Sequence, residues 1–172
     1  MIAVLLLVVA SWAPGCYTPP ISAAVVDGFR EPSCPYCAGN RGLEYEPPPG
    51  TTVRAAAGGV VEFSGLVVRV RYVVVRQHDG MRASYGYLAT TPLRQGDIVA
   101  SGERIGTTTA RFFFGLRDGD RYVDPAPRIG RLVGSPRLVP FDGSPGRPAH
   151  RTRLVCAGSR GIAADRSGGP SG

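Results

Sequence analysis

The sequence predicts an all-β protein, an antiparallel β-sandwich or open barrel with irregular tails. Short apolar runs with strand-like alternation follow one another from residue 50 to residue 125, and turn residues separate them. No stretch of helical length shows helical periodicity. The 172 residues include 24 Gly and 16 Pro, a composition that favours turns and short strands over long helices.

The individual strands are predicted from β-branched and aromatic runs between turn signals. Gly58-Gly59 separates the first two strands of the main block, and His78-Asp79-Gly80 is a hairpin turn because Asp-Gly suits positive φ. Asp118-Gly119-Asp120 is a second hairpin turn, and Asp124-Pro125 ends the last strand. The predicted strands are Ala24–Val26, Val53–Ala57, Val60–Phe63, Leu66–Arg76, Met81–Leu88, Ile98–Ala100, Arg111–Arg117 and Arg121–Val123.

Composition divides the chain into four segments. Residues 1–15 are interpreted as a signal peptide, because their apolar run is too short to cross a bilayer but suits the hydrophobic region of an export signal. Residues 16–38 are an extended lead-in rich in Pro and Cys, and residues 39–130 form the β-domain. Residues 131–172 are a tail rich in Arg, Gly and Pro that we expect to be largely disordered beyond residue 157.

The positive charge is concentrated in the tail. The net charge is +7 and all 20 basic residues are arginine. Residues 1–125 hold 12 Arg and 11 acidic residues, whereas residues 126–172 hold 8 Arg and 2 acidic residues. Such a tail can attract anionic polymers. We expect it to be solvated, and we expect no nucleic-acid partner.

The four cysteines predict disulfides if the chain is exported. Cys34 and Cys37 have CxxC spacing, which fits a structural disulfide, a redox pair or half a zinc site; the disulfide is preferred, because a zinc site needs a second ligand pair. Cys16 with Cys156 is then the expected second pair, which would clamp both tails. Cys16 also follows a partial lipoprotein box, so lipidation with membrane anchoring at Cys16 and cleavage without a lipid both stay open, and cleavage is preferred.

A series of motifs occurs in one order between residues 39 and 126. These motifs are Gly42–Tyr45 with Pro49–Val53, Ala55–Val61, His78–Gly80 with Ser84–Leu88, Gln95–Gly106, Phe114–Arg117 and Val123–Ala126. The series resembles the lysostaphin-type (LytM-like) zinc endopeptidases, which cut peptide bridges in bacterial cell walls. The resemblance implies their β-fold, of the duplicated hybrid motif type, and a monomer in the envelope or the surroundings of a bacterium.

The same resemblance implies that the zinc site is degenerate. The three ligand positions of the family correspond to Asn40, Glu44 and Phe113, of which only Glu44 offers a suitable donor. The two catalytic histidine positions correspond to Tyr87 and Arg111. We therefore expect no catalytic residue, no metal and no cofactor. Enzymatic activity stays open, and its absence is favoured.

Three functions remain open. The first is an inactive domain with a binding groove. It would use the groove either to bind peptidoglycan peptides or to bind and regulate a cell-wall hydrolase. The second is a zinc endopeptidase with a non-standard site, and the third is a structural exported β-domain. The residues expected to line the groove are Asn40, Arg41, Glu44, Tyr85, Tyr87 and Arg111.

One ion pair is predicted at the vacated metal position. The resemblance implies that Glu44 and Arg111 occupy positions that face one another in the family, and a carboxylate without its metal needs a cationic partner if it is buried. If the pair is buried, Arg111→Ala should cause a large loss of stability. A loss typical of exposed sites would mean that the pair is absent or exposed.

Overall fold

The computed structural model describes residues 16–34, 36–133 and 153–156, and in these residues it is built almost wholly of strands. The predicted signal peptide and the segment beyond residue 157 lie outside the described residues. The one helical element described is a 3-10 turn, so this part of the chain contains no helix long and apolar enough to cross a membrane. The elements are β1 (Val25–Asp27), β2 (Leu43–Tyr45), β3 (Thr52–Arg54), β4 (Gly59–Val67), β5 (Val70–Gln77), β6 (Arg82–Thr90), β7 (Ile98–Val99), β8 (Arg104–Asp118), β9 (Arg121–Val123), η1 (Ala126–Arg128), β10 (Arg131–Val133) and β11 (Arg153–Val155).

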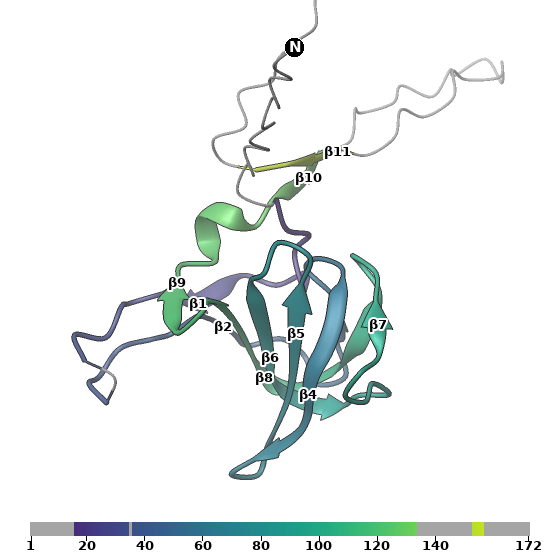
Figure 1. Cartoon of the computed structure of the whole chain (residues 1–172), viewed down its shortest axis with the longest axis horizontal. Helices are drawn as coiled ribbons and strands as arrows, with labels where there is room; N and C mark the ends of the chain where they lie inside the picture. The colour runs from purple at the N-terminus through teal and green to yellow at the C-terminus, as the bar shows by residue number, and fades with distance from the viewer. Residues whose placement is uncertain (1–15, 35, 134–152, 157–172) are drawn as a thin grey trace, which may run out of the picture.

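One antiparallel sheet forms the body of the protein, and the long strand β8 organises it. The strand order is β1-β2-β8-β6-β5-β4-β7, and β3 and β9 pair with further segments of β8. β8 can hold four neighbours because it has 15 residues, whereas β2, β3 and β9 have 3 each. In Figure 1 β4, β5 and β6 lie side by side, and the hairpin between β4 and β5 extends from the body.

The core lies on one face of these strands. Along β8, Phe112, Phe114 and Leu116 are buried while the residues between them are not part of the core. Val73 and Val75 of β5 contribute from the same side. This period-two alternation is the pattern expected of a sheet with one face packed and the other accessible, and it confirms the all-β prediction.

Tyr85 belongs to this core, and its predicted place in the groove is wrong. Its side chain is fully buried, and its ring centroid lies 5.4 Å from that of Phe114. The backbone N–H of Ala56 donates a hydrogen bond of 2.8 Å to the Tyr85 hydroxyl oxygen. Burial raises the pKa of Tyr85. The physical reason is alternation along β6, which turns Ser84 and Gly86 outward and the tyrosine between them inward.

The predicted strand Leu66–Arg76 is also wrong as a single element. β4 ends at Val67 and β5 begins at Val70, with Val67 and Val70 as cross-strand partners. Val68 and Arg69 make the turn with φ of 44° and 69°. A β-branched residue at positive φ is unusual. The sequence has no Gly, Asn or Asp here, so it carries no turn signal.

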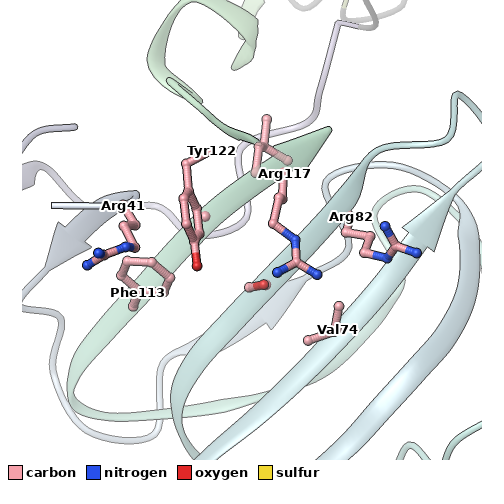
Figure 2. Close-up of a pocket in the computed structure, with 9 residues that line it drawn as sticks. Arg41, Val74, Arg82, Phe113, Arg117 and Tyr122 are labelled. Atoms are coloured by element: carbon pink, nitrogen blue, oxygen red, sulfur yellow. The ribbon is translucent and has the colours of Figure 1, made fainter. Parts of the chain in front are cut away.

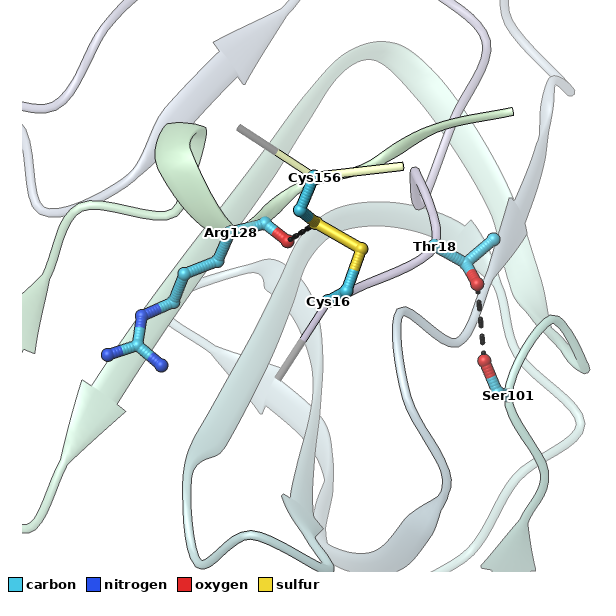
Figure 3. The surroundings of a disulfide bond; sticks show 5 residues. All are labelled: Cys16, Thr18, Ser101, Arg128 and Cys156. Carbon is cyan, nitrogen blue, oxygen red and sulfur yellow. Dashed lines mark hydrogen bonds between the residues drawn. A yellow bond between two sulfur atoms is a disulfide. The ribbon is translucent and has the colours of Figure 1, made fainter. Parts of the chain in front are cut away.

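The lead-in and the tail are tied together at one end of the sheet. Cys16 and Cys156 form a disulfide, as predicted, and the Cys156 sulfur lies 3.1 Å from the carbonyl oxygen of Arg128 (Figure 3). Tyr17 is buried, and its backbone N–H donates to the Arg128 carbonyl. A sulfur in this disulfide has no free valence for a lipid thioether. Membrane anchoring through Cys16 and this cross-link therefore exclude one another.

The lead-in contains the second disulfide, and the tail contains a small sheet. Cys34 and Cys37 form the predicted second disulfide. The tail is not wholly irregular where the structure describes it, because Leu132 and Leu154 are cross-strand partners in a small sheet of β10 and β11. The local sequence could not show this pairing, because about twenty residues separate the two strands and local patterns do not contain the register between distant strands.

Candidate functional site: the outer face of the sheet

The candidate site is the face of β2, β8, β6 and β5 that points away from the core, which we call the outer face. Strand register arranges its side chains in cross-strand rows. The first row contains Glu44, Phe113 and Gly86, and the next contains Gly115, Ser84 and Val74. The last row is Tyr122, Arg117, Arg82 and Arg76.

The end of the face that holds the positions aligned with the family's zinc ligands carries the predicted ion pair. A guanidinium nitrogen of Arg111 donates to Glu44 Oε2 at 2.9 Å, and this hydrogen bond raises the pKa of Arg111. The pairing is confirmed, but the side chains are 54% and 30% exposed, so the pair is not buried. Glu44 points outward because Leu43 and Tyr45 on either side of it occupy the core.

Aromatic rings complete this end. The Arg111 guanidinium carbon lies 4.7 Å from the centroid of the Tyr87 ring, within cation–π distance. Tyr87 has a φ of 60°, where β6 departs from regular pairing between Gly86 and Leu88. The Tyr72 ring covers Gly86 so closely that a Cβ there would lie 2.4 Å from it. Backbone strain in a non-glycine residue is characteristic of functional sites, and here it aims the Tyr87 ring at Arg111.

Asn40 does not line this end as an open polar group. Its side chain is buried, and its Nδ2 donates to the Asp27 carbonyl oxygen at 3.4 Å. The Gly42 N–H donates to Asn40 Oδ1 at 3.3 Å. Both ends of the amide are therefore engaged in shaping the turn before β2. The prediction that Asn40 lies on the groove floor is corrected accordingly.

The residues at the family's zinc position do not fit a zinc ion. A catalytic zinc needs three protein donors and an open position. Phe113 has no donor atom, the Asn40 amide is engaged with backbone groups, and the Glu44 carboxylate is bound by Arg111. Throughout the described residues, no three His, Cys, Asp or Glu side chains gather closely enough to hold a metal ion.

The opposite end of the outer face is hollow. Figure 2 shows the pocket, a cavity of about 150 Å³. Arg41, predicted as a groove residue, lies here, with its guanidinium carbon 5.4 Å from the centroid of the Tyr122 ring. Phe113, predicted as a degenerate ligand position, also lines the pocket, and the sequence prediction missed the remaining residues. The lining residues are Arg41, Val74, Arg82, Ser84, Phe113, Gly115, Leu116, Arg117 and Tyr122.

The fold and the site together define the class of protein. The catalytic domain of the antimicrobial peptidase lysostaphin from Staphylococcus simulans superposes with a TM-score of 0.54 and 20% identity, covering 61% of this chain and 90% of that domain. This likeness shows a shared fold. Residues 38–125, just over half of the chain, match peptidase family M23. The chain belongs to peptidase family M23, which confirms the resemblance found in the sequence.

Two relatives place this domain among larger bacterial proteins. Uncharacterized protein Rv2891 of Mycobacterium tuberculosis is 31% identical over 141 residues, which are 74% of this chain and 55% of the relative. Cell division protein DipM of Caulobacter vibrioides is 29% identical over 102 residues, which are 51% of this chain and 17% of DipM. The chain therefore spans little more than half of the first relative and a small part of the second.

Proposed function

We propose that this chain is an exported, non-catalytic M23 domain that binds peptidoglycan peptides along its outer face. The observation that carries the proposal is the ion pair of Glu44 with Arg111. It sets a cation where the family's site requires a dication, and Phe113 beside it has no atom to donate. An arginine bound to the remaining carboxylate opposes metal binding both by its charge and by occupying the donor.

The chemistry of the face supports binding rather than hydrolysis. Arg111, Tyr87 and Tyr72 at one end, and Arg41 and Tyr122 at the other, are side chains suited to recognise carboxylates and amides. The side chains between them are small or apolar, so an extended peptide could lie across the sheet. A ligand of this kind needs contacts on the face and no activated water.

Export is supported by the two disulfides. Such cross-links persist in oxidising compartments outside the cytosol. Because the sulfur of Cys16 is used in one of them, the proposed form is free and not lipid-anchored. Placement at the bacterial cell wall also agrees with the similarity to a bacterial cell division protein.

Retention on purified peptidoglycan sacculi tests the proposal. We expect the chain to sediment with sacculi at low salt, and Tyr87→Ala to reduce retention because it removes a ring of the outer face. Tyr36→Ala is the matched control, since Tyr36 is fully exposed in the loop of the Cys34–Cys37 disulfide. Failure of the unchanged chain to sediment would contradict the proposal, and so would equal losses in the two variants.

Two measurements distinguish the competing functions. One zinc ion per chain after purification without chelator, together with release of soluble fragments from sacculi, would replace the proposal with a zinc endopeptidase of non-standard site. Binding to a cell-wall hydrolase, lost in Tyr87→Ala and accompanied by no binding to sacculi, would assign the face to hydrolase regulation instead. Binding of neither sacculi nor a hydrolase by the unchanged chain would leave a structural domain.

A further inference from the structure

The geometry points to a carboxylate-binding pocket at the Arg117 end of the outer face, which takes the free carboxylate of a peptide. That the peptide comes from the cell wall rests on the proposed function. The pocket itself rests on three features of the structure: an unbalanced row of arginines, a cavity kept open by glycine, and guanidinium groups held in place before a ligand arrives.

The row of arginines crosses three neighbouring strands. Arg117 of β8 is the direct cross-strand partner of Arg82 of β6, and Arg82 is the partner of Arg76 of β5. Like charges directly opposite one another on one face of a sheet are destabilising. A sequence that places three cations in one row therefore requires anions close by.

Among the residues that the structure describes, one carboxylate pairs with this row. Glu62 binds Arg82 through Oε2 at 2.7 Å and Arg76 through Oε1 at 2.9 Å. Arg117 forms no ion pair with any described residue, and its Nε is buried without a hydrogen-bond acceptor. A buried donor without an acceptor is costly. The Nε itself is enclosed, so an oxyanion would be met by the terminal nitrogens of Arg117, whose guanidinium lines the cavity.

The cavity beside Arg117 has the size and lining for this oxyanion. It measures about 150 Å³, enough for a carboxylate and the atoms next to it, and no acidic side chain lines it. Its floor is the cross-strand row of Gly115, Ser84 and Val74. A Cβ on Gly115 would lie 2.9 Å from the Phe113 ring and 3.2 Å from the Arg41 carbonyl oxygen. Glycine at this position therefore leaves the cavity open above the strand.

The cationic groups are positioned in advance. Glu62 fixes Arg82, and the Tyr122 ring supports Arg41. Figure 2 shows the Arg117 guanidinium and the Tyr122 hydroxyl directed toward the same space. Planar guanidinium groups bind carboxylates with two parallel hydrogen bonds, and preorganisation reduces the entropy lost on binding.

The position of the pocket favours a carboxylate at the end of a peptide. Phe113 borders the pocket and is also the cross-strand partner of Glu44 at the other end of the face. A peptide whose terminal carboxylate sits at Arg117 would therefore run past Phe113 toward Glu44 and Arg111. Phosphate shares the same hydrogen-bonding chemistry, so the test must separate the two sources of oxyanion.

Calorimetric titration of the full chain provides that test. The probes are N-acetyl-L-alanyl-L-alanine, N-acetyl-D-alanyl-D-alanine, the corresponding C-terminal amides, and inorganic phosphate. We expect at least one free acid to bind, and its amide to bind at least about tenfold more weakly, as befits loss of a charge-assisted hydrogen bond. Arg117→Gln should lose a similar factor. Arg104→Gln is the matched control, because it removes the same charge from an exposed position on β8 outside the pocket.

The outcomes are separable from those of the sacculus experiment. Equal binding of acid and amide, or equal losses in the Arg117 and Arg104 variants, would overturn the carboxylate pocket. Tighter, Arg117-dependent binding of inorganic phosphate than of either acid would overturn it in favour of a phosphate site. Carboxylate binding without retention on sacculi would uphold the pocket and overturn the proposed function, whereas retention without carboxylate binding would do the reverse.

Discussion

Alternate residues of β8 face two different environments. Phe112, Phe114 and Leu116 are buried in the core. Phe113, which lies between two of them, and Arg117, which follows Leu116, face the outer surface. The inner residues hold the sheet together, and the outer residues determine what the sheet can bind. One side of the strand therefore belongs to the core of a peptidase family M23 fold, while the side chains on its other side do not suit zinc.

The largest effect should come from the inner side of β8. Phe114→Ala removes a fully buried ring that packs on Tyr85, and we expect a loss of about 3–5 kcal/mol in the free energy of unfolding. Urea denaturation monitored by fluorescence measures it. Phe113→Ala, one residue away on the outer side, is the control and should cost clearly less. Equal losses would mean that the two sides of the strand do not differ as described.

A smaller effect is expected at the hydroxyl of Tyr85. Tyr85→Phe keeps the ring but leaves the Ala56 N–H without its acceptor, and a buried unsatisfied donor costs about 1–3 kcal/mol. The same urea denaturation at neutral pH gives the value. An unchanged free energy of unfolding would show that water replaces the hydroxyl, and that the inner face is less tightly closed than the structure indicates.

The same variant has a signature in alkaline solution. Burial raises the pKa of Tyr85 above the ordinary value of 10.0, so the folded state keeps its proton at a pH where the unfolded state loses it. This contribution to stability is complete below pH 10 and decreases as the pH rises toward the folded pKa. Unfolding free energies measured from pH 9 to 11 should fall more steeply for the unchanged chain than for Tyr85→Phe. Parallel slopes would contradict burial of the tyrosine.

The inner side could be predicted from the sequence because its signal is local. Alternation of Phe112, Phe114 and Leu116 with other residues identifies a strand and its buried face without knowledge of its neighbours. The turn at Val68–Arg69 escaped prediction because the fold imposes positive φ on residues that seldom adopt it. Tyr85 was misplaced because a motif match assigned it a role that the alternation of its own strand opposes.

The outer side depends on register, which local patterns do not contain. The Glu44–Arg111 pair was predictable only because a family resemblance aligned two segments far apart in the chain. The pocket had no such guide. Arg82, Arg117 and Tyr122 come together because three strands pair in one particular register, and a shift of one residue would turn each side chain to the other face.

At the Glu44 end of the outer side, removing a charge should have little effect on folding. Arg111→Ala breaks an ion pair whose members are both accessible to solvent, and such pairs contribute little because water and salt screen them. We expect the Tm to stay within about 2 °C of that of the unchanged chain. Differential scanning calorimetry measures it, with Arg121→Ala as the exposed control. A drop several times that of the control would restore the buried pair that the sequence suggested.

At the Arg117 end, removing a charge should have the opposite sign. Without ligand, Arg117 stands opposite Arg82 with no carboxylate of its own, so Arg117→Gln relieves a repulsion across the strands. We expect the free energy of unfolding at low salt to rise by a few tenths of a kcal/mol, the scale of a cross-strand pair, and the gain to shrink as salt screens the charges. Urea denaturation at two salt concentrations measures both effects, with Arg94→Gln, at an exposed loop position, as the control for net charge. A loss of stability would show that the protein itself already balances Arg117, and the two ends of the outer side would then be alike: both closed by the chain's own groups, with no place held open for a ligand.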